Sequence, residues 1–214
     1  MATRQQALAT GRGKQAEGPT LHPPSSRRAG AIAGISLLLM AVISMFSIIV
    51  TEMDSPSPAL LRVAVVGWMI VVFMDIVVAW ALGIIFRPVD APVSQLAAWL
   101  RLAYSAVFLV GISFLSAGDR EAFHHLWDRG LFLFGMHLLL IGWLAWRSQW
   151  LPRWLGVLVS VAGLGYTLDT VIATLATDPA FELAIVTFMG EPLLAIWLLM
   201  RAWRGGAAVR SDLR

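Results

Sequence analysis

The feature that most constrains this chain is a run of 23 residues, from Ala29 to Thr51, without a charged side chain. An α-helix needs about 20 mainly apolar residues to cross the hydrocarbon core of a bilayer. Lipid offers backbone N–H and C=O groups no hydrogen-bond partner, so a segment that crosses it must be helical. The run therefore predicts a transmembrane helix.

Five further apolar segments follow, and the composition agrees with them. Hydrophobic residues make up 58% of the 214 residues and charged residues only 14%, against about 25% charged in soluble domains. We predict an all-α, polytopic integral membrane bundle of about six transmembrane helices, occupying residues 29–204. The expected spans are residues 30–50, 60–86, 93–116, 123–146, 154–176 and 181–203.

The two ends of the chain are polar. Residues 1–28 are rich in Gly, Gln, Pro and Arg and contain no apolar run, which predicts a disordered cytoplasmic arm rather than a signal peptide. Residues 205–214 are expected to form a short basic cytoplasmic tail. The connections between spans are short, so successive helices should be antiparallel neighbours, and we find no internal repeat of the kind seen in inverted-repeat transporters.

The distribution of basic residues predicts the orientation. With the N-terminus inside, twelve of the sixteen Lys and Arg residues fall on the inner side and three on the outer side, while Arg101 lies within a span. This bias favours cytoplasmic N- and C-termini in a multi-pass protein of the plasma membrane. Four tryptophans would form the inner aromatic belt and one would lie on the outer side: Trp146, Trp150, Trp154 and Trp203, then Trp127.

Other classes of site and partner are disfavoured. The chain has no cysteine, which excludes disulfides, cysteine zinc sites and iron–sulfur clusters. Its basic residues are spread over loops and tails, so we expect no nucleic-acid partner. We also expect no cofactor; every histidine except His22 is in the fourth span, and bis-histidine haem ligation needs facing helices. The expected partners are the lipid bilayer and a small-molecule or ion ligand, with the oligomeric state left open.

Five ionisable residues lie inside predicted spans: Asp75, Arg101, His137, Asp169 and Glu191. Each costs at least ~2.5–3.5 kcal/mol near a helix centre unless it has a partner or a wet cavity. At about 1.5 Å of rise per residue, Arg101 and His137 are about 12–14 Å from the inner helix ends, and Asp75 and Glu191 about 16–18 Å. Asp169 is further out, at about 22 Å. The first four thus share one layer.

We expect these groups to face the bundle interior, with Arg101 pairing Asp75 and Glu191. Three buried acids cannot all ionise around one arginine. The third carboxyl should therefore be protonated, or bonded to Tyr166, His137 or water. Two interpretations of this intramembrane polar cluster stay open: a functional site, or a layer that only specifies helix partners.

Local patterns accompany the cluster. Arg101, Tyr104 and Ser105 lie at i, i+3 and i+4 and form a polar stripe. In the fifth span a small-polar stripe favours close helix packing; it comprises Ser160, Gly163, Thr167, Thr170 and Thr174, with Tyr166 and Asp169 beside it. Pro192 lacks a backbone donor and follows Glu191 in mid-span, which predicts a kink or bulge there.

A second polar group lies at the outer end of the fourth span. Glu121, His124, His125 and Asp128 have the i, i+3, i+4 and i+7 spacing that places ligands on one helix face, as a metal site requires. A polar interfacial turn is the favoured interpretation, so no metal is expected. The chain contains no nucleophile elbow, His-Glu-x-x-His motif or phosphate-binding glycine loop.

The second half of the chain resembles a bacterial six-helix family known as domain-of-unknown-function family 4386. The resemblance covers most of residues 120–203 and is most specific in the inner loop, Arg147-Ser148 followed by Leu151-Pro152-Arg153-Trp154-Leu155-Gly156. It also includes Leu131 to Ser148, Ala162 to Asp169, and Gly190-Glu191. The resemblance implies a bacterial inner-membrane protein and no particular reaction. His137, Tyr166, Asp169 and Glu191 fall on the positions that carry it.

Three functional hypotheses follow. The first is a channel, carrier or proton-coupled transporter that uses the buried acids as ion or proton sites. The second is an intramembrane enzyme acting on a lipid or quinone, with His137, Asp169 and Tyr166 as acid–base groups. The third is a non-catalytic scaffold or sensor whose basic arm binds anionic lipid or a partner. The residues favour a non-enzymatic protein with a transport-like or ligand-binding role.

Overall fold

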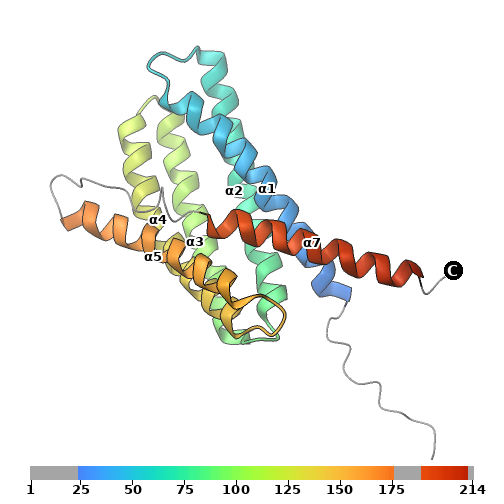
Figure 1. Cartoon of the computed structure of the whole chain (residues 1–214). Coiled ribbons are helices and arrows are strands. Elements are labelled where there is room, and N and C mark those ends of the chain that lie inside the picture. Colours follow the sequence, from blue (N-terminus) through green and yellow to red (C-terminus); the bar gives the residue numbers. More distant parts are fainter. Residues whose placement is uncertain (1–23, 176–188, 212–214) are drawn as a thin grey trace, which may run out of the picture.

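The computed structural model describes residues 24–175 and 189–211, and within these ranges the secondary structure is helical. The described residues form six helices (Figure 1). They are α1 (Pro24–Glu52), α2 (Pro58–Phe86), α3 (Ala91–Ser116), α4 (Arg120–Arg147), α5 (Arg153–Leu175) and α7 (Gly190–Ser211). The expected all-α fold is confirmed.

Side-chain caps set where three of the helices begin. The Ser57 hydroxyl accepts a hydrogen bond from the Leu60 N–H at the start of α2. Asp90 and Asp119 do the same for Val93 in α3 and Ala122 in α4. Each cap satisfies one of the backbone donors that the first helical turn leaves without a partner.

A glycine ends α3 and permits the sharp turn into α4. Gly118 has a φ of +88°, a left-handed conformation that favours glycine. Its N–H donates to the Leu115 carbonyl, and the Asp119 N–H donates to the Phe114 carbonyl. This is the Schellman arrangement of a helix C-terminus. The chain therefore reverses within three residues, which makes α3 and α4 neighbours.

The helices form a closed ring. Each of α1 to α5 packs on the next along the chain, and α7 packs on both α1 and α5. In Figure 1, α7 runs obliquely across the bundle, from its middle toward the C-terminal end of the chain. The first residues of α7 thus lie deep among the other helices, and this places Glu191 in the interior.

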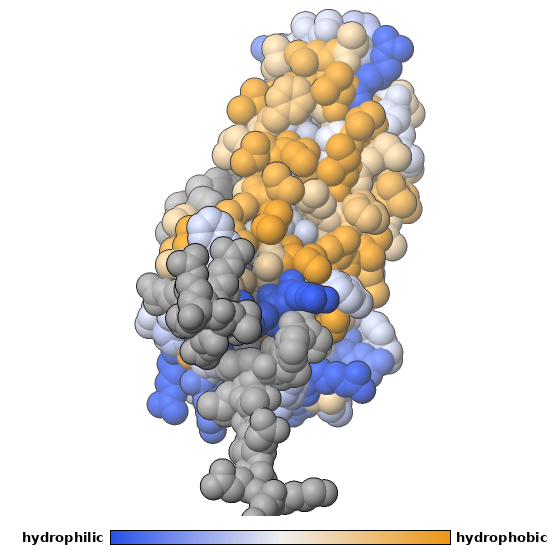
Figure 2. Space-filling view, turned by 90° about the vertical axis from the view of Figure 1, so that its right-hand side faces the viewer, coloured by the Kyte–Doolittle hydropathy of each residue, from blue (hydrophilic) through white to orange (hydrophobic). Residues whose placement is uncertain are grey.

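Within the part of the chain that the structure describes, five helices are long and apolar enough to cross a membrane: α1 from Arg27, and α2 to α5. Figure 2 shows a broad apolar surface between hydrophilic ends, as a protein embedded in lipid requires. The chain is a multi-pass membrane protein. Of the predicted sixth span, residues 181–188 lie outside the described residues, as does the predicted disorder of residues 1–23.

The contact between α4 and α5 depends on four glycines. Gly135 and Gly142 of α4 face Gly163 and Gly156 of α5. A Cβ atom on Gly163 would lie 2.7 Å from the Gly135 carbonyl oxygen, and one on Gly142 would lie 2.8 Å from that of Gly156. Backbones approach this closely only where side chains are absent. The small residues of the fifth span therefore allow α4 and α5 to pack closely, which is the interpretation that the sequence pattern favours.

Pro192, where the sequence predicts a kink or bulge, lies in the first turn of α7. Glu191 is in the first turn of α7, which begins directly after a turn residue, Met189. A proline in the first helical turn needs no backbone donor. Pro192 is thus compatible with a helix start, and residues 181–188, on which the predicted kink also depends, lie outside the described residues.

Candidate functional site

Arg101 of α3 lies at the centre of an ion-pair cluster inside the bundle. Its side chain is fully buried, and its nitrogen atoms contact Asp75 of α2, His137 of α4 and Glu191 of α7. We call these four residues the arginine cluster. The expectation that matching depths would bring Asp75 and Glu191 to Arg101 agrees with this geometry.

Asp75 makes the closest contact with the guanidinium. Arg101 Nε donates to Asp75 Oδ1 over 2.7 Å, and Nη2 lies 2.6 Å from the same oxygen. Asp75 is only 2% exposed. An ion pair of this kind is retained inside an apolar bundle because each charge needs the other, and removal of one leaves the second uncompensated.

Glu191 makes the more accessible contact. Arg101 Nη1 donates to Glu191 Oε1 over 2.9 Å, and the Glu191 side chain is 21% exposed whereas that of Asp75 is 2% exposed. Glu191 comes from the first turn of α7. Within the cluster, Glu191 is therefore the less buried of the two carboxylates.

Hydrogen bonds determine the protonation state of His137, which is fully buried. Its Nδ1 lies 2.8 Å from the carbonyl oxygen of Ala97, and its Nε2 lies 3.2 Å from Arg101 Nη1. A carbonyl oxygen only accepts and an arginine nitrogen only donates. The histidine must therefore carry its proton on Nδ1 and accept with Nε2, so it is neutral in this arrangement.

The charges of the arginine cluster do not balance. Two carboxylates face one guanidinium, and the neutral His137 adds no charge. With both acids ionised the cluster would carry a net charge of −1. An uncompensated charge in the membrane interior is costly, so one proton shared by the two carboxyls is the simplest way to neutralise the site.

Aromatic rings cover the arginine on the side toward α4 and α5. The guanidinium carbon lies 5.1 Å from the Phe134 ring centroid, within the range of a cation–π contact. Tyr166 packs edge-on against Phe134, with ring centroids 5.3 Å apart. Tyr166 is thus adjacent to the cluster through Phe134. α4 packs against both α3 and α5 (Figure 1).

Two other polar residues of the stripe on α3 make contacts of their own. Tyr104 stacks on Phe108 and packs against Phe134, and the Ser105 hydroxyl donates to the Arg101 backbone carbonyl. Asp169 is half-buried on α5. The hydrogen bonds of Arg101 within the described part of the chain go to Asp75, His137 and Glu191.

The outer group of possible metal ligands is divided between two pairs. His125 Nε2 lies 3.6 Å from Glu121 Oε1, whereas His124 Nε2 lies 3.3 Å from Glu52 Oε1 at the end of α1. Asp128 follows His124 by one helical turn on α4. Over residues 24–175 and 189–211, no group of three or more His, Cys, Asp or Glu residues has the geometry to hold a metal ion.

Two partners in the cluster were not predicted from the sequence. The Ala97 carbonyl holds the histidine ring, and Phe134 covers the guanidinium. Ala97 lies one helical turn before Arg101, and Phe134 lies three residues before His137. Helical spacing could have placed both residues on the inner face, but backbone acceptors and apolar rings have no signal that distinguishes them from ordinary core residues.

Comparison with known proteins assigns the chain to a family. Residues 32–118 and 119–202 match the family described as "Domain of unknown function (DUF4386)", and the chain belongs to that family. A similar protein of Archaeoglobus fulgidus, described as an uncharacterized protein, is 35% identical over 138 residues; these are 64% of this chain and 83% of that protein. No solved structure matches the chain. The resemblance seen in the sequence is confirmed.

Proposed function

We propose that this membrane protein binds and releases a proton at the arginine cluster, as part of a transport function. The observation that supports the proposal is the convergence of two carboxylates on a single buried guanidinium. One proton is needed to neutralise the group, and Glu191 is partly exposed. A protein that moves protons or proton-coupled ligands needs a titratable group of this kind inside the membrane.

His137 argues against the intramembrane-enzyme hypothesis. Both of its ring nitrogens are engaged, one with the Ala97 carbonyl and one with Arg101. A general acid or base must be within hydrogen-bond reach of the group whose proton it transfers. Neither a carbonyl nor a guanidinium in this position takes up a proton, so the histidine serves to orient the arginine.

A structural role is the second candidate, and the number of joined helices favours it. The arginine cluster connects α2, α3, α4 and α7 through a single side chain. Such a layer could act only to select helix partners. The two candidates differ in what they predict for Glu191→Gln, because glutamine still accepts a hydrogen bond from Arg101 but cannot exchange a proton.

Proton flux into vesicles tests the proposal. The purified full-length chain is placed in liposomes that contain a pH-sensitive dye, and a potassium gradient with valinomycin sets the interior negative. We expect acidification with the unaltered chain and with Glu121→Gln, an exposed glutamate at the outer end of α4. We expect Glu191→Gln to reduce the flux to that of empty vesicles. Equal flux with Glu191→Gln and with the unaltered chain would refute the proposal.

We further propose that both termini are cytoplasmic and that the membrane is the inner membrane of a bacterium. The basis is the excess of basic residues on the side that carries both ends. The inner interface would then include the aromatic–arginine contacts of Trp146 with Arg153 and of Trp150 with Arg201. Both side-chain types favour the headgroup level of a bilayer.

A further inference from the structure

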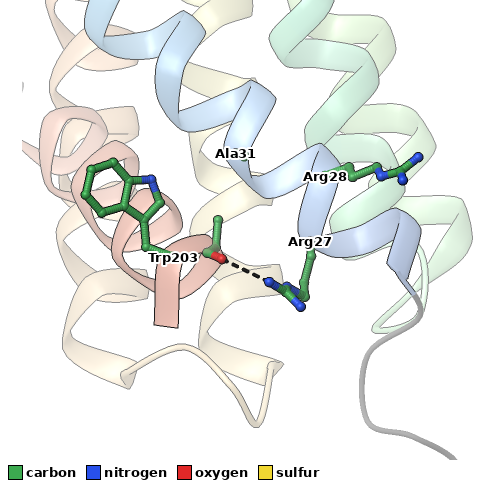
Figure 3. A pocket seen from close by; sticks show the side chains of 5 residues that line it. Arg27, Arg28, Ala31 and Trp203 are labelled. Atoms are coloured by element: carbon green, nitrogen blue, oxygen red, sulfur yellow. Dashed lines mark hydrogen bonds between the residues drawn. The ribbon is translucent and has the colours of Figure 1, made fainter. Parts of the chain in front are cut away.

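A pocket lies where the beginning of α1 meets the second half of α7, away from the arginine cluster. Its volume is about 380 Å³, and Arg27, Arg28 and Ala31 of α1 line it together with Ala202 and Trp203 of α7 (Figure 3). Two adjacent basic residues at a pocket beside a membrane-crossing helix call for an anionic ligand.

Arg27 joins the two walls of this pocket. Its Nη2 donates to the Ala202 carbonyl over 3.3 Å, as the dashed line in Figure 3 shows. Its Nε has no hydrogen-bond partner among the described residues. The ion pairs found in the described part of the chain involve neither Arg27 nor Arg28. Among the described residues, no acidic side chain neutralises the positive charge at this place.

The pocket is at the level of the lipid headgroups. Arg27 and Arg28 directly precede the uncharged run that begins at Ala29, so they lie at the boundary of the hydrocarbon. Trp203 is 80% exposed, and tryptophan is enriched at this level because its ring is apolar and its N–H is polar. A ligand in the pocket would thus contact water on one side and hydrocarbon on the other.

An apolar strip continues from the pocket into the membrane. Arg28, Ile32, Ile35 and Leu39 follow one another at helical spacing on one face of α1. Each of these side chains is exposed on the surface of the bundle. A charged residue at the membrane boundary is thus followed by three apolar ones along the direction of the acyl chains.

From this combination we propose that the pocket binds the phosphate of an anionic phospholipid, whose acyl chains lie along the exposed face of α1. Arg28, at the head of the apolar strip, binds the phosphate, and Arg27, which Figure 3 shows on the side of α1 toward Trp203, adds its positive charge beside it. Trp203 packs beside the glycerol backbone. A free phosphate would use the two arginines but gain nothing from Ile32 and Ile35, so the apolar strip favours the lipid.

Native mass spectrometry of the full-length chain in detergent tests the site. Phosphatidylglycerol and phosphatidylcholine with the same acyl chains are added in turn, and the bound lipid is counted. We expect tighter binding of phosphatidylglycerol. Arg27→Gln combined with Arg28→Gln should weaken it by about tenfold or more, and Arg87→Gln, which removes an exposed arginine outside the pocket, should leave it unchanged.

Two further arms separate the possible outcomes. Arg28→Gln alone keeps the bond from Arg27 to Ala202 and should weaken phosphatidylglycerol binding without loosening the two helices. Glycerol phosphate, which lacks acyl chains, should compete weakly. Equal binding of the two lipids, or equal loss with Arg87→Gln, would overturn the proposal. Competition by glycerol phosphate as strong as by the lipid would overturn its lipid identity.

Discussion

Arg101 is the residue on which the interior of the bundle depends. It is fully buried, and its contacts extend to three other helices. The guanidinium has five N–H groups in a fixed plane, which allows a single side chain to hold two carboxylates and an imidazole. A lysine could not keep this geometry, because its charge is a single point on a flexible chain.

Arg101→Met should be severely destabilising. It leaves Asp75 and Glu191 in the bundle without their counter-charge, which typically costs about 3–5 kcal/mol. We expect loss of that size in the free energy of unfolding, measured by denaturant titration in detergent. Arg87→Met, at an exposed position, should change the free energy of unfolding little. Comparable losses for both variants would show that the arginine cluster is not the source of the lost stability.

Neutralising the two carboxylates should have unequal effects on stability. Glu191→Gln retains an acceptor for Arg101 and leaves a balanced pair with Asp75, so the free energy of unfolding should change by less than about 1 kcal/mol. Asp75→Asn removes the carboxylate that contacts two guanidinium nitrogens and should cost more. The same unfolding titration measures both, and the reverse order would contradict the assigned geometry.

The sequence was sufficient to predict that most of the ionisable residues lie at one depth in the membrane, because helical rise is constant and charges in lipid need partners. It could not determine the protonation of His137, which depends on the Ala97 carbonyl. It also grouped Tyr104 with Arg101 by spacing alone, whereas the ring stacks on Phe108. Side chains at neighbouring positions on one helix face point the same way, but they can contact different residues.

At the scale of the helices, the glycines of α4 and α5 determine how closely these two elements pack. Gly135 and Gly163 let the backbones meet opposite each other, as do Gly142 and Gly156 one level further along. This close contact holds His137 and Phe134 of α4 in position beside α3. The packing of one helix pair therefore contributes to the geometry of the arginine cluster.

Gly163→Ala should destabilise the bundle. The added Cβ would lie 2.7 Å from the Gly135 carbonyl oxygen and 2.8 Å from the Leu139 backbone nitrogen, so the helices must separate. Overpacking of this kind costs about 1–3 kcal/mol, and the melting temperature in detergent should fall.

Gly30→Ala is the matched control for this change. An added Cβ at Gly30 would meet nothing within 4 Å, and alanine favours a helix by about 0.8–1.0 kcal/mol over glycine. The melting temperature should stay constant or rise. A rise with Gly163→Ala as well would mean that the close approach of α4 and α5 is not required.

The start of α7 shows where prediction from the sequence reaches its limit for an element. A proline preceded by glycine and glutamate fits both a kinked helix and a first helical turn. The hydrophobic pattern of residues 181–203 continues through this point and cannot distinguish them. The packing of Gly190 against the Leu158 carbonyl region of α5 accompanies the helix start. That is a tertiary contact, which a local pattern does not contain.

At the scale of the whole molecule, the ring of helices closes through α7, and the membrane orientation follows from charge. Because the chain has no cysteine, single cysteines introduced at exposed positions report orientation directly. We predict that Ser55→Cys, between α1 and α2, reacts with a membrane-impermeant maleimide from outside the cell. Gln149→Cys, between α4 and α5, should react only after permeabilisation. The opposite pattern would reverse the orientation.

The most direct measurement of the central claim, that the arginine cluster exchanges one proton, is difference infrared spectroscopy of the purified chain between acidic and alkaline buffer. We predict a carboxylic acid C=O band typical of an apolar environment, lost in Glu191→Gln and retained in Asp54→Asn, which alters an exposed loop carboxylate. If the band is absent from the unaltered chain, or survives when both Asp75→Asn and Glu191→Gln are present, the cluster holds no exchangeable proton and serves only to pack the helices.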